Sequence, residues 1–433
     1  MLLYCRAREK SRLLNQKGLR AKLKSPNHQK NPKPMKILVL NCGSSSIKYQ
    51  LFEMETKTVL AKGGIEKIGL PGAFIKFNAA DGSKKVIEQD IPEHTVGVEL
   101  IFKVLTDPVD GALKSLDELD AVGHRMVHGG EKFAKSVILD EEVLKAFEAC
   151  NDLAPLHNPA NLKGVAAVTA LLPEIPQVGV FDTAFHQTMP AKAYMYAIPY
   201  DMYEKYAVRR YGFHGTSHRY VSARALEYLG MKAEGTKVIT AHIGNGGSLA
   251  AVKDGKCQDT SMGLTPLEGV MMGTRSGDID GGAVSFIMKK EGLDADGISN
   301  YLNKKSGLAG ISCKSSDMRE VFQGSVDGDP KCQLAIDMYT YRIKKYIGAY
   351  AAALGGCDVL VFTAGVCENQ SDIREMVCKD MEWMGIKLDV EKNATIHGEE
   401  AVISAPDSKV KVVVIPTDEE LMIATDTMEL VSK

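Results

Sequence analysis

Residues Lys36–Phe52 read K-I-L-V-L-N-C-G-S-S-S-I-K-Y-Q-L-F, two apolar runs on either side of a turn of small polar residues. This pattern is typical of a β-hairpin. Residues Lys237–Val252 read K-V-I-T-A-H-I-G-N-G-G-S-L-A-A-V and repeat it in the second half of the chain. Ordinary hairpin turns would look the same, so the repeat alone leaves that interpretation open. Two such hairpins opening two halves of one chain predict duplicated α/β domains that flank a central cleft, where a ligand would bind.

Short apolar runs alternate with longer helical patterns from Met35 onward, which is typical of an α/β architecture. We expect strands at Ile37–Leu40, Ile47–Phe52, Ala121–Val127, Val178–Phe181, Val238–Ala241, Leu249–Val252, Val359–Thr363 and Val410–Ile415. We expect helices at Glu141–Cys150, Ala160–Leu172, His218–Leu229, Cys332–Leu354 and Glu419–Val431. The length of 433 residues exceeds one ordinary hydrophobic core and favours two or three domains.

The composition excludes several classes of protein. With 45% hydrophobic and 25% charged residues, the chain resembles an average soluble protein, and it has no apolar run of about 18 residues that would span a membrane. The formal net charge is −2, but residues 1–34 hold ten Lys or Arg and one acid, which is +9 and leaves −11 on the other 399 residues. That acidic body has no basic footprint for nucleic acid. We therefore expect neither nucleic acid nor a membrane as a partner.

Residues 1–34 differ from the rest of the chain. They lack the apolar stretch of a secretory signal, and their Arg-rich, acid-poor composition fits either an extension of the folded protein or an organelle targeting peptide. We favour a basic N-terminal extension and expect it to be disordered. The nine cysteines include no C-x-x-C pair, so neither a disulfide framework nor a zinc site is indicated. A reducing, cytoplasmic location fits this cysteine usage best.

The two commonest nucleotide loops, G-x-x-x-x-G-K-[ST] and G-x-G-x-x-G with a following acid, are absent. A phosphate group would therefore bind at the hairpin turns. The first turn offers an amide, three hydroxyls and an ammonium group, from Asn41, Ser44, Ser45, Ser46 and Lys48. Hydroxyl and backbone donors suit phosphate oxygens, and an amide carbonyl suits hydrated Mg²⁺. The second turn, Gly244–Gly247, allows close approach of its backbone to a polyphosphate.

Seven of the ten histidines fall between His124 and His242. The pairs His124/His128 and His214/His218 have the i, i+4 spacing of helical metal ligands. Neither pair has the H-E-x-x-H form, and both lie beside Gly-rich turns. Hydrogen bonding to substrate or backbone is therefore favoured over zinc binding.

Five motifs mix His, Arg and Asp: H-R-M-V-H-G-G (His124–Gly130), A-P-L-H-N-P (Ala154–Pro159), F-D-T-A-F-H (Phe181–His186), F-H-G-T-S-H (Phe213–His218) and G-T-R-S-G-D (Gly273–Asp278). Arg125 and Arg275 lie at Gly-rich turns, where a guanidinium can bind a carboxylate or phosphate through two hydrogen bonds. Asp182 follows an apolar strand, where open α/β sheets carry functional groups. Each motif alone fits an ordinary polar turn, but the five together indicate a site for anions.

These motifs resemble those of the acetate/propionate/butyrate kinase family, in the superfamily of sugar kinases, Hsp70 and actin. The resemblance runs from Met35 to the C-terminus. It rests on L-V-L-N-C-G-S-S-S-I-K and D-T-A-F-H-Q-T-M-P, the family's two signature stretches, followed in order by R-R-Y-G-F-H-G-T-S-H, A-H-I-G-N-G-G-S, T-P-L-E-G-V-M-M-G-T-R-S-G-D and I-P-T-D-E-E-L. It implies a homodimer of chains with two ribonuclease-H-like, actin-like domains, at 35–185 plus 420–433 and at 186–419, the second holding the nucleotide.

The activity that the resemblance implies is reversible transfer of the γ-phosphoryl group of ATP to acetate, giving acetyl phosphate and ADP, with Mg²⁺ or Mn²⁺. The implied catalytic residues are Asp182, His214 and Arg275, and the metal ligands are Asn41 and Glu419. Acetate would lie between Arg125 and an apolar pocket of Val127, Leu156, Phe213 and Pro266. The nucleotide would contact Lys48, His242, Ile243, Gly244, Asn245, Gly246, Asp317, Met318, Arg319, Gly365, Val366, Cys367, Glu368 and Asn369, with Ser44 and Ser46 of the first turn.

A carboxylate is already a nucleophile at neutral pH, so the main barrier to such a reaction is bringing one anion up to another. In a direct in-line transfer, Arg125 would hold acetate while Arg275, His214 and Mg²⁺ offset charge on the moving phosphoryl group. We therefore expect Asp182 to orient groups, or to ligate metal through water, and not to act as an obligatory base.

Three positions depart from the family pattern. Cys367 replaces the second Gly of G-x-G-E-N, which would cost about 1 kcal/mol if that position needs a positive φ. Asp418 replaces Asn in T-N-E-E and adds negative charge near the metal. Gly281 replaces a common Pro, which would loosen the loop after Arg275.

Two other interpretations stay open at this point. Propionate or butyrate could be the preferred acid, because one methylene in an apolar pocket discriminates by only about 1–3 kcal/mol. In a different class, the chain would be an ATP-gated binding module that hydrolyses nucleotide slowly to change shape. A conformational ATPase would need neither the pair Arg125 and Arg275 nor a small apolar pocket.

Overall fold

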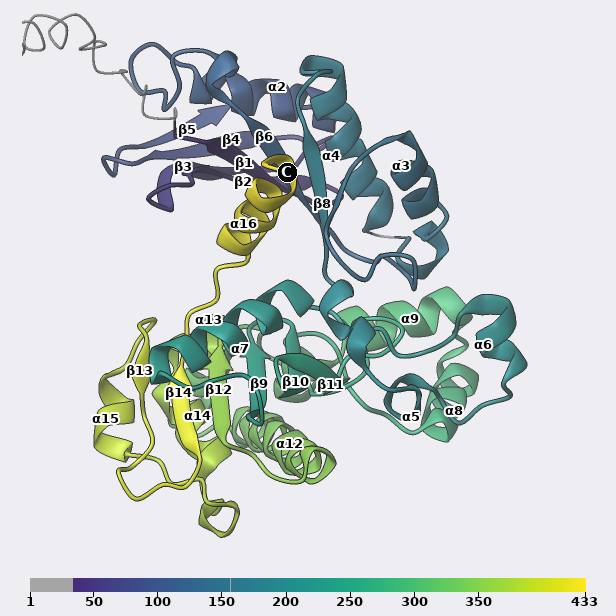
Figure 1. Cartoon of the computed structure of the whole chain (residues 1–433). Helices are drawn as coiled ribbons and strands as arrows, with labels where there is room; N and C mark the ends of the chain where they lie inside the picture. Colours follow the sequence, from purple (N-terminus) through teal and green to yellow (C-terminus); the bar gives the residue numbers. More distant parts are fainter. Residues whose placement is uncertain (1–33, 156) are drawn as a thin grey trace, which may run out of the picture. The chain divides into compact units, whose positions relative to one another are not determined.

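The computed structural model describes residues 34–155 and 157–433 (Figure 1). The predicted N-terminal extension lies outside the described residues except for Pro34, and so does Leu156.

The first sheet has eight strands in the order β5-β4-β3-β2-β1-β6-β8-β7. They are β1 (Lys36–Cys42), β2 (Ser46–Glu53), β3 (Thr58–Glu66), β4 (Phe74–Ala79), β5 (Lys84–Glu88), β6 (Ala121–Met126), β7 (Val137–Ile138) and β8 (Gln177–Phe181). Strands β1 to β5 form an antiparallel meander, whereas β1, β6 and β8 run parallel. Their carboxyl ends therefore meet at one edge of the sheet.

The second sheet has six strands in the order β11-β10-β9-β12-β14-β13. They are β9 (Lys237–Ile243), β10 (Gly247–Lys253), β11 (Lys256–Thr260), β12 (Val359–Thr363), β13 (Ala401–Val402) and β14 (Lys411–Val414). Strands β9, β10 and β11 form an antiparallel meander, and β9, β12 and β14 run parallel.

The two sheets repeat one topology. An antiparallel meander of three strands, β1-β2-β3 or β9-β10-β11, is followed by two strands parallel to its first member, β6 and β8 or β12 and β14. All eight predicted strands are present, and the two hairpins noted in the sequence open the two halves. The predicted α/β fold of two duplicated ribonuclease-H-like, actin-like units is confirmed.

The five predicted helices are also present, with shifted ends. They are α3 (Glu141–Glu148), α4 (Asn158–Leu171), α7 (Gly215–Leu229), α12 (Pro330–Leu354) and α16 (Glu419–Val431). The sequence reading missed α2 (His94–Leu105), α5 (Ala191–Tyr194), α6 (Asp201–Tyr206), α8 (Gly281–Glu291), α9 (Ala295–Lys304), α10 (Gly307–Ser312), α11 (Met318–Val326), α13 (Ala364–Asn369), α14 (Ser371–Cys378) and α15 (Val390–Thr395). Among the helices described, none combines the length and apolarity needed to cross a membrane.

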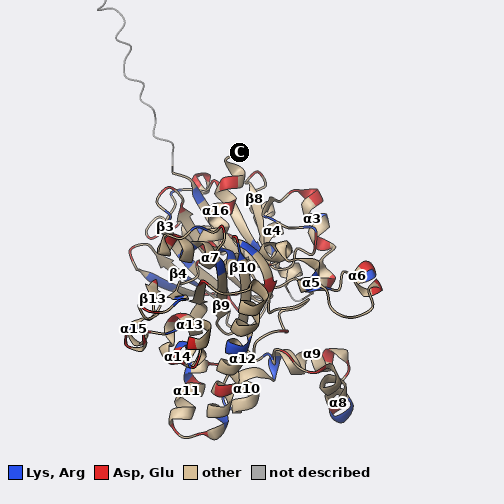
Figure 2. Ribbon diagram, turned by 60° about the horizontal axis from the view of Figure 1, so that its bottom comes forward, with Lys and Arg blue, Asp and Glu red and all other residues tan. Residues whose placement is uncertain are grey.

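Helices cover both faces of the first sheet. Helices α2 and α4 pack on one face through a core that includes Leu38 and Ile47, whereas α16 covers the other face at Ile37 and Val39. The chain thus returns to its first sheet at its C-terminus (Figure 1). In the second sheet, α12 packs against β9 and β10. Figure 2 shows both signs of charge spread over the outer helices, with a basic group at the end of α8.

Candidate active site

Three predicted site residues meet at the carboxyl edge of the first sheet. Asn41 lies at the end of β1, Arg125 in β6 and Asp182 directly after β8. Arg125 Nε and Nη2 donate to the two carboxylate oxygens of Asp182, at 3.0 and 2.6 Å, and Nη1 donates to Asn41 Oδ1 at 3.4 Å. Burial disfavours the charge on Arg125, but the Asp182 carboxylate outweighs this and raises the pKa of the guanidinium.

Glu419 brings a second carboxylate to this group. It is the first residue of α16, whose N-terminus is capped by Asp418 accepting from the Leu421 N–H at 2.8 Å. Glu419 is half-buried, and its Oε1, which solvent does not reach, has no hydrogen-bond partner. Burial, with added repulsion from Asp182 and Glu420, raises the pKa of Glu419 to about 7, although Arg125 opposes the shift.

Oxygen donors of this kind suit a hard divalent cation. Asn41 supplies an amide oxygen, Asp182 a carboxylate, and Glu419 a buried oxygen without a partner. Within the described residues, no group of three or more His, Cys, Asp or Glu is arranged to ligate a metal. Mg²⁺ and Mn²⁺ take oxygen donors such as these and keep several water ligands.

His214 and His242 stack at the start of α7. His214 has a left-handed backbone (φ 55°), and its ring lies 4.2 Å from that of His242 at an interplanar angle of 20°. His242 Nδ1 hydrogen-bonds the Ser217 hydroxyl at 2.8 Å, which in turn contacts the Thr417 hydroxyl at 2.7 Å. Burial, and then the neighbouring His242 and Arg125, lowers the pKa of His214 far below its ordinary value. His214 is therefore a neutral imidazole at pH 7.

The second hairpin turn faces His214 and Arg275. A Cβ added to Gly246 would lie 3.4 Å from His214 Nε2 and 3.7 Å from Arg275 Nη1. The Gly273 N–H donates to the Asn245 carbonyl at 3.0 Å and ties the loop of Arg275 to this turn. Arg275 Nη1 donates to the Pro266 carbonyl at 3.1 Å, and burial lowers the pKa of Arg275.

Two residues of the predicted apolar pocket lie in one buried apolar cluster. Val127 and Phe213 pack together in a small buried cluster with Met262 and Met272, which the sequence reading did not single out. The Pro266 carbonyl accepts a hydrogen bond from Arg275 Nη1, which also contacts Met272 of this cluster. Leu156 lies outside the described residues.

A cavity of about 650 Å³ gathers eight of the sixteen predicted nucleotide contacts. Its lining includes Gly244, Asn245, Asp317, Met318, Arg319, Gly365, Val366 and Asn369. Leu308, Ser316 and Gln370 line it as well and were not predicted. Arg319 is held by Asp317, which accepts from Nη2 at 2.5 Å.

Other predicted nucleotide residues do not line this cavity. Glu368 Oε1 accepts from the N–H groups of Ala364 and Thr417, at 2.7 and 3.0 Å, and so fixes two backbone segments. Cys367 is fully buried inside α13 with an ordinary backbone, and the left-handed residue of this loop is Ala364 (φ 66°). The strain considered for Cys367 therefore does not arise, because its position needs no positive φ.

Lys48 lies on the exposed face of the first sheet. It lines a hollow of about 300 Å³ together with Lys62, Lys76 and Glu420. Its positive charge opposes part of the rise in the pKa of Glu419, so Lys48 lies near the acidic start of α16. Ser44 is exposed, and Ser46 is the first residue of β2. His242 and Ile243 end β9 beside the second turn.

Two asparagines that the sequence reading did not assign join the strand ends. Asn161 accepts from the Val127 N–H at 3.0 Å and donates to the Cys42 carbonyl at 2.9 Å, which links β1 to the end of β6. Asn158 makes the equivalent pair of bonds with the backbone of His128. His157 lies nearby, since burial and then the charges of Arg125 and Arg275 lower its pKa. The motif A-P-L-H-N-P was the only sequence signal for this segment.

The other histidines of the two spaced pairs are hydrogen-bonded or stacked. His124 Nε2 contacts Gln177 Oε1 at 2.8 Å, and His218 contacts the hydroxyls of Thr240 and Ser248 at 2.7 and 3.0 Å. The His128 ring packs edge-on against Tyr211.

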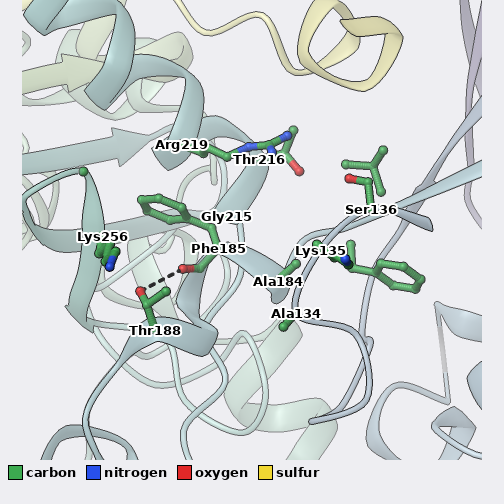
Figure 3. A pocket seen from close by; sticks show the side chains of 13 residues that line it. Ala134, Lys135, Ser136, Ala184, Phe185, Thr188, Gly215, Thr216, Arg219 and Lys256 are labelled. Atoms are coloured by element: carbon green, nitrogen blue, oxygen red, sulfur yellow. Dashed lines mark hydrogen bonds between the residues drawn. The ribbon is translucent and has the colours of Figure 1, made fainter. Parts of the chain in front are cut away.

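A cavity of about 170 Å³ adjoins the chain segments on either side of Asp182 and the two residues that follow His214 (Figure 3). Its lining includes Phe181, Gly215 and Thr216, with Lys135, Arg219 and Lys256 at its walls. Arg219 is paired with Asp426, at 2.6 Å. Gly215 donates to the Asp182 carbonyl at 2.9 Å and so joins α7 to the end of β8.

Comparison with known proteins gives one consistent result. The model of the "Acetokinase family" matches residues 36–425. An acetate kinase of Bacteroides thetaiotaomicron is 72% identical over 399 residues, which cover 92% of this chain and all of that protein. The crystal structure of the Porphyromonas gingivalis acetate kinase has a TM-score of 0.89 at 61% identity and covers 92% of this chain and 100% of that one. A propionate kinase from Francisella tularensis has a TM-score of 0.86 at 43% identity, with the same coverage.

Proposed function

The chain belongs to the acetokinase family and is a phosphotransferase with a carboxyl acceptor, and from this premise we propose that it transfers the γ-phosphoryl group of ATP reversibly to acetate. The products are acetyl phosphate and ADP. The observation that carries the proposal is a small buried apolar cluster, Val127 and Phe213 with two methionines, whose Val127 follows the carboxylate-binding candidate Arg125 by two positions. A guanidinium beside a pocket for a short alkyl group is what recognition of a small carboxylic acid requires.

Acetate would bind with its carboxylate at Arg125 and its methyl group against Val127 and Phe213. Nε and Nη2 of Arg125 are already engaged by Asp182, while Nη1 makes only a long contact of 3.4 Å with Asn41. Nη1 is therefore the donor left for the acid. The bound carboxylate needs no base, because it is already ionised at neutral pH.

Asp182 orients Arg125 in this mechanism. Both of its oxygens accept from the guanidinium, and the side chain is buried with 1% exposure. Two parallel charge-assisted bonds fix the plane of the guanidinium and hence the direction of its third donor. Transfer of a proton to Asp182 would weaken both bonds.

Arg275 and His214 would stabilise the phosphoryl group during in-line transfer. Both lie against Gly246 of the second turn, where the ends of a nucleotide's phosphates would approach. Arg275 supplies a positive charge, whereas His214 contributes as a neutral N–H donor because its pKa is so low.

Asn41 and Glu419 would hold Mg²⁺, or Mn²⁺ in its place, and the ion when bound would neutralise charge on the phosphate oxygens. The adenosine part of ATP fits the cavity of about 650 Å³ that Gly244, Asp317 and Gly365 line. Lys48 and the first turn lie toward the phosphates in this arrangement.

We also propose the domain boundaries, the oligomeric state and the cellular location that the resemblance implied. The domains are 35–185 plus 420–433 and 186–419, and the chain forms a cytoplasmic homodimer. Helix α8 supports a partner surface, because its apolar residues Val284, Phe286, Ile287 and Met288 include none that is buried. Phe286 is 62% exposed. Such a helix gains stability when an apolar surface covers it.

An acyl hydroxamate assay tests the function. Acetate with ATP and Mg²⁺ should give acetyl phosphate, which hydroxylamine traps as a coloured hydroxamate. Consumption of ATP that acetate does not stimulate would instead favour a conformational ATPase. Relative kcat/KM for acetate, propionate and butyrate decides between an acetate kinase and a kinase for a longer acid, a choice that the 43% identical propionate kinase keeps relevant.

A further inference from the structure

Two methionines form the buried part of the apolar cluster beside the site. Val127 and Phe213 retain 7% and 3% exposure, whereas Met262 and Met272 are both fully buried at 0%. The cluster therefore has an outer layer, Val127 and Phe213, and an inner layer, Met262 and Met272. The inner layer lies behind the residues that a bound methyl group would touch first.

Each layer is connected to a residue of the proposed transfer chemistry. In the outer layer, Val127 follows Arg125 by two positions and Phe213 directly precedes His214. In the inner layer, Met272 Sδ lies 3.8 Å from Arg275 Nη1. The cluster is thus the apolar surface that all three of these polar groups share.

The backbone behind Met262 is held firmly. Arg210 Nη1 donates to the carbonyls of Thr260, Ser261 and Met262, at 2.9, 3.0 and 3.1 Å. Its Nη2 binds Glu268 at 2.5 Å, and Glu268 also accepts from the Tyr196 hydroxyl. Because the main chain is fixed by these bonds, the depth of the pocket depends on the methionine side chains.

We propose that Met262 and Met272 determine the length of the acid that this protein phosphorylates, by closing the inner end of the acyl pocket. The inference rests on the proposed function. Acetate would place its only methyl group against the outer layer. The additional carbon atoms of propionate and butyrate would reach the inner layer and require the methionines to move. An unbranched thioether has several rotatable bonds, so the wall resists longer acids without excluding them.

Met262→Ala and Met272→Ala test the proposal with three acids, through the ratio of kcat/KM for propionate or butyrate to that for acetate. Each substitution removes about three heavy atoms (Cγ, Sδ and Cε), which opens space for more than one methylene group, and one methylene is worth roughly tenfold or more in such a pocket. We expect the propionate ratio to rise about tenfold in either variant. Met272→Ala should also lower kcat for every acid, since it removes a contact to Arg275.

Met271→Ala is the matched control. Met271 is adjacent in sequence and 2% exposed, but it packs into the large core of the second sheet with residues such as Leu308 and Tyr339. It should lose stability as the other variants do and keep the wild-type ratio. Met262→Leu preserves the volume of the wall and should also keep that ratio.

An unchanged ratio in folded Met262→Ala and Met272→Ala would overturn the proposal, and so would an equal rise in Met271→Ala. Where the alanine variants do not fold, Met262→Val opens the pocket less and should raise the propionate ratio about threefold. The proposed function itself is refuted if the wild-type protein forms no acyl phosphate from any of the three acids. If the wild-type protein forms acetyl phosphate and the variants keep its kcat/KM ratios, only the proposed role of Met262 and Met272 is refuted.

Discussion

Replacing Asp182 with Asn distinguishes an orienting carboxylate from a catalytic base. Asp182 accepts bonds of 3.0 and 2.6 Å from Arg125 Nε and Nη2. Asn offers one carbonyl oxygen and turns an NH₂ group toward the second donor, so one charge-assisted bond is lost. Such a bond contributes about 1.5–3 kcal/mol. We expect kcat/KM for acetate to fall about 10- to 150-fold, since 1.36 kcal/mol corresponds to a factor of ten.

The assay is initial-rate formation of acetyl hydroxamate as acetate is varied at saturating ATP and Mg²⁺. Glu400→Gln is a matched control, because Arg224 Nε and Nη2 bind the two Glu400 oxygens in the same forked geometry, at 2.6 and 2.7 Å. That pair is partly exposed and includes no residue assigned to the site, so its loss should cost at most about 1 kcal/mol of stability and leave kcat/KM unchanged.

Two results would refute the reasoning about Asp182. Near-normal kcat/KM in the Asn variant would mean that the carboxylate does not orient Arg125. A loss of more than about 10⁴-fold, with the variant still folded, would exceed what one lost bond explains and would point to a base. Unfolding by urea should be measured in parallel, because removing one partner of a buried ion pair destabilises by about 3–5 kcal/mol.

Three further predictions concern other parts of the molecule. Gly246→Ala places a methyl group 3.4 Å from His214 Nε2 without a backbone clash. The melting temperature should therefore stay unchanged, while KM for ATP rises about tenfold or more. An unchanged KM would show that the phosphates do not bind at this turn. Gly281→Pro should raise the free energy of unfolding by about 0.4–1 kcal/mol in urea titrations. Gly281 is the first residue of α8, a Cβ there would meet no neighbouring atom, and the preceding Asp280 is extended. A loss of stability would contradict this prediction. Burial lowers the pKa of His124 to about 4, against about 6.5 in the unfolded chain. Below pH 6.5 the unfolded chain therefore binds a proton that the folded chain does not. The free energy of unfolding falls between pH 6.5 and pH 4, by up to about 1.4 kcal/mol per pH unit. His124→Asn should make the acid limb of the stability curve shallower, and an equally steep limb would exclude this group.

The strands that carry the site were predictable because they are short, continuous apolar runs. Strands β1 and β8 are mostly buried and have apolar interiors, whereas β6 begins apolar and ends with the polar pair His124 and Arg125 before Met126. The missed strand β3 has mixed polarity and two glycines, one of which, Gly63, lets the backbone of β4 approach closely. A Cβ there would meet the Lys76 carbonyl at 2.0 Å. This requirement comes from the neighbouring strand and leaves no periodic pattern in the sequence.

Helix α8 was missed for a related reason. Its sequence is apolar, yet none of its residues is buried in this chain, so it lacks the two-sided pattern by which an amphipathic helix is recognised. Glycines at its first two positions weaken the signal further.

The candidate site shows the same limit at the level of side chains. The motifs predicted Arg125 and Asp182 separately, but their forked bond depends on the pairing of β6 with β8. Met271 and Met272 are neighbours in one loop and enter different cores. Neither residue type nor spacing predicts which methionine faces the site, because the direction of a side chain in an irregular loop is set by tertiary packing.

In the proposed function, the charges of the site give a divalent cation a part in nucleotide binding as well as in transfer. Arg125 is neutralised by Asp182, and His214 is uncharged because burial lowers its pKa. Arg275 and Lys48 remain, but Lys48 faces the acidic start of α16, where Glu419 and Glu420 lie. Cations that lie beside carboxylates, in a body of net charge −11, offset only part of the charge of a nucleoside triphosphate. The missing positive charge must come with the nucleotide, and the buried oxygen of Glu419 without a partner provides a place to receive it.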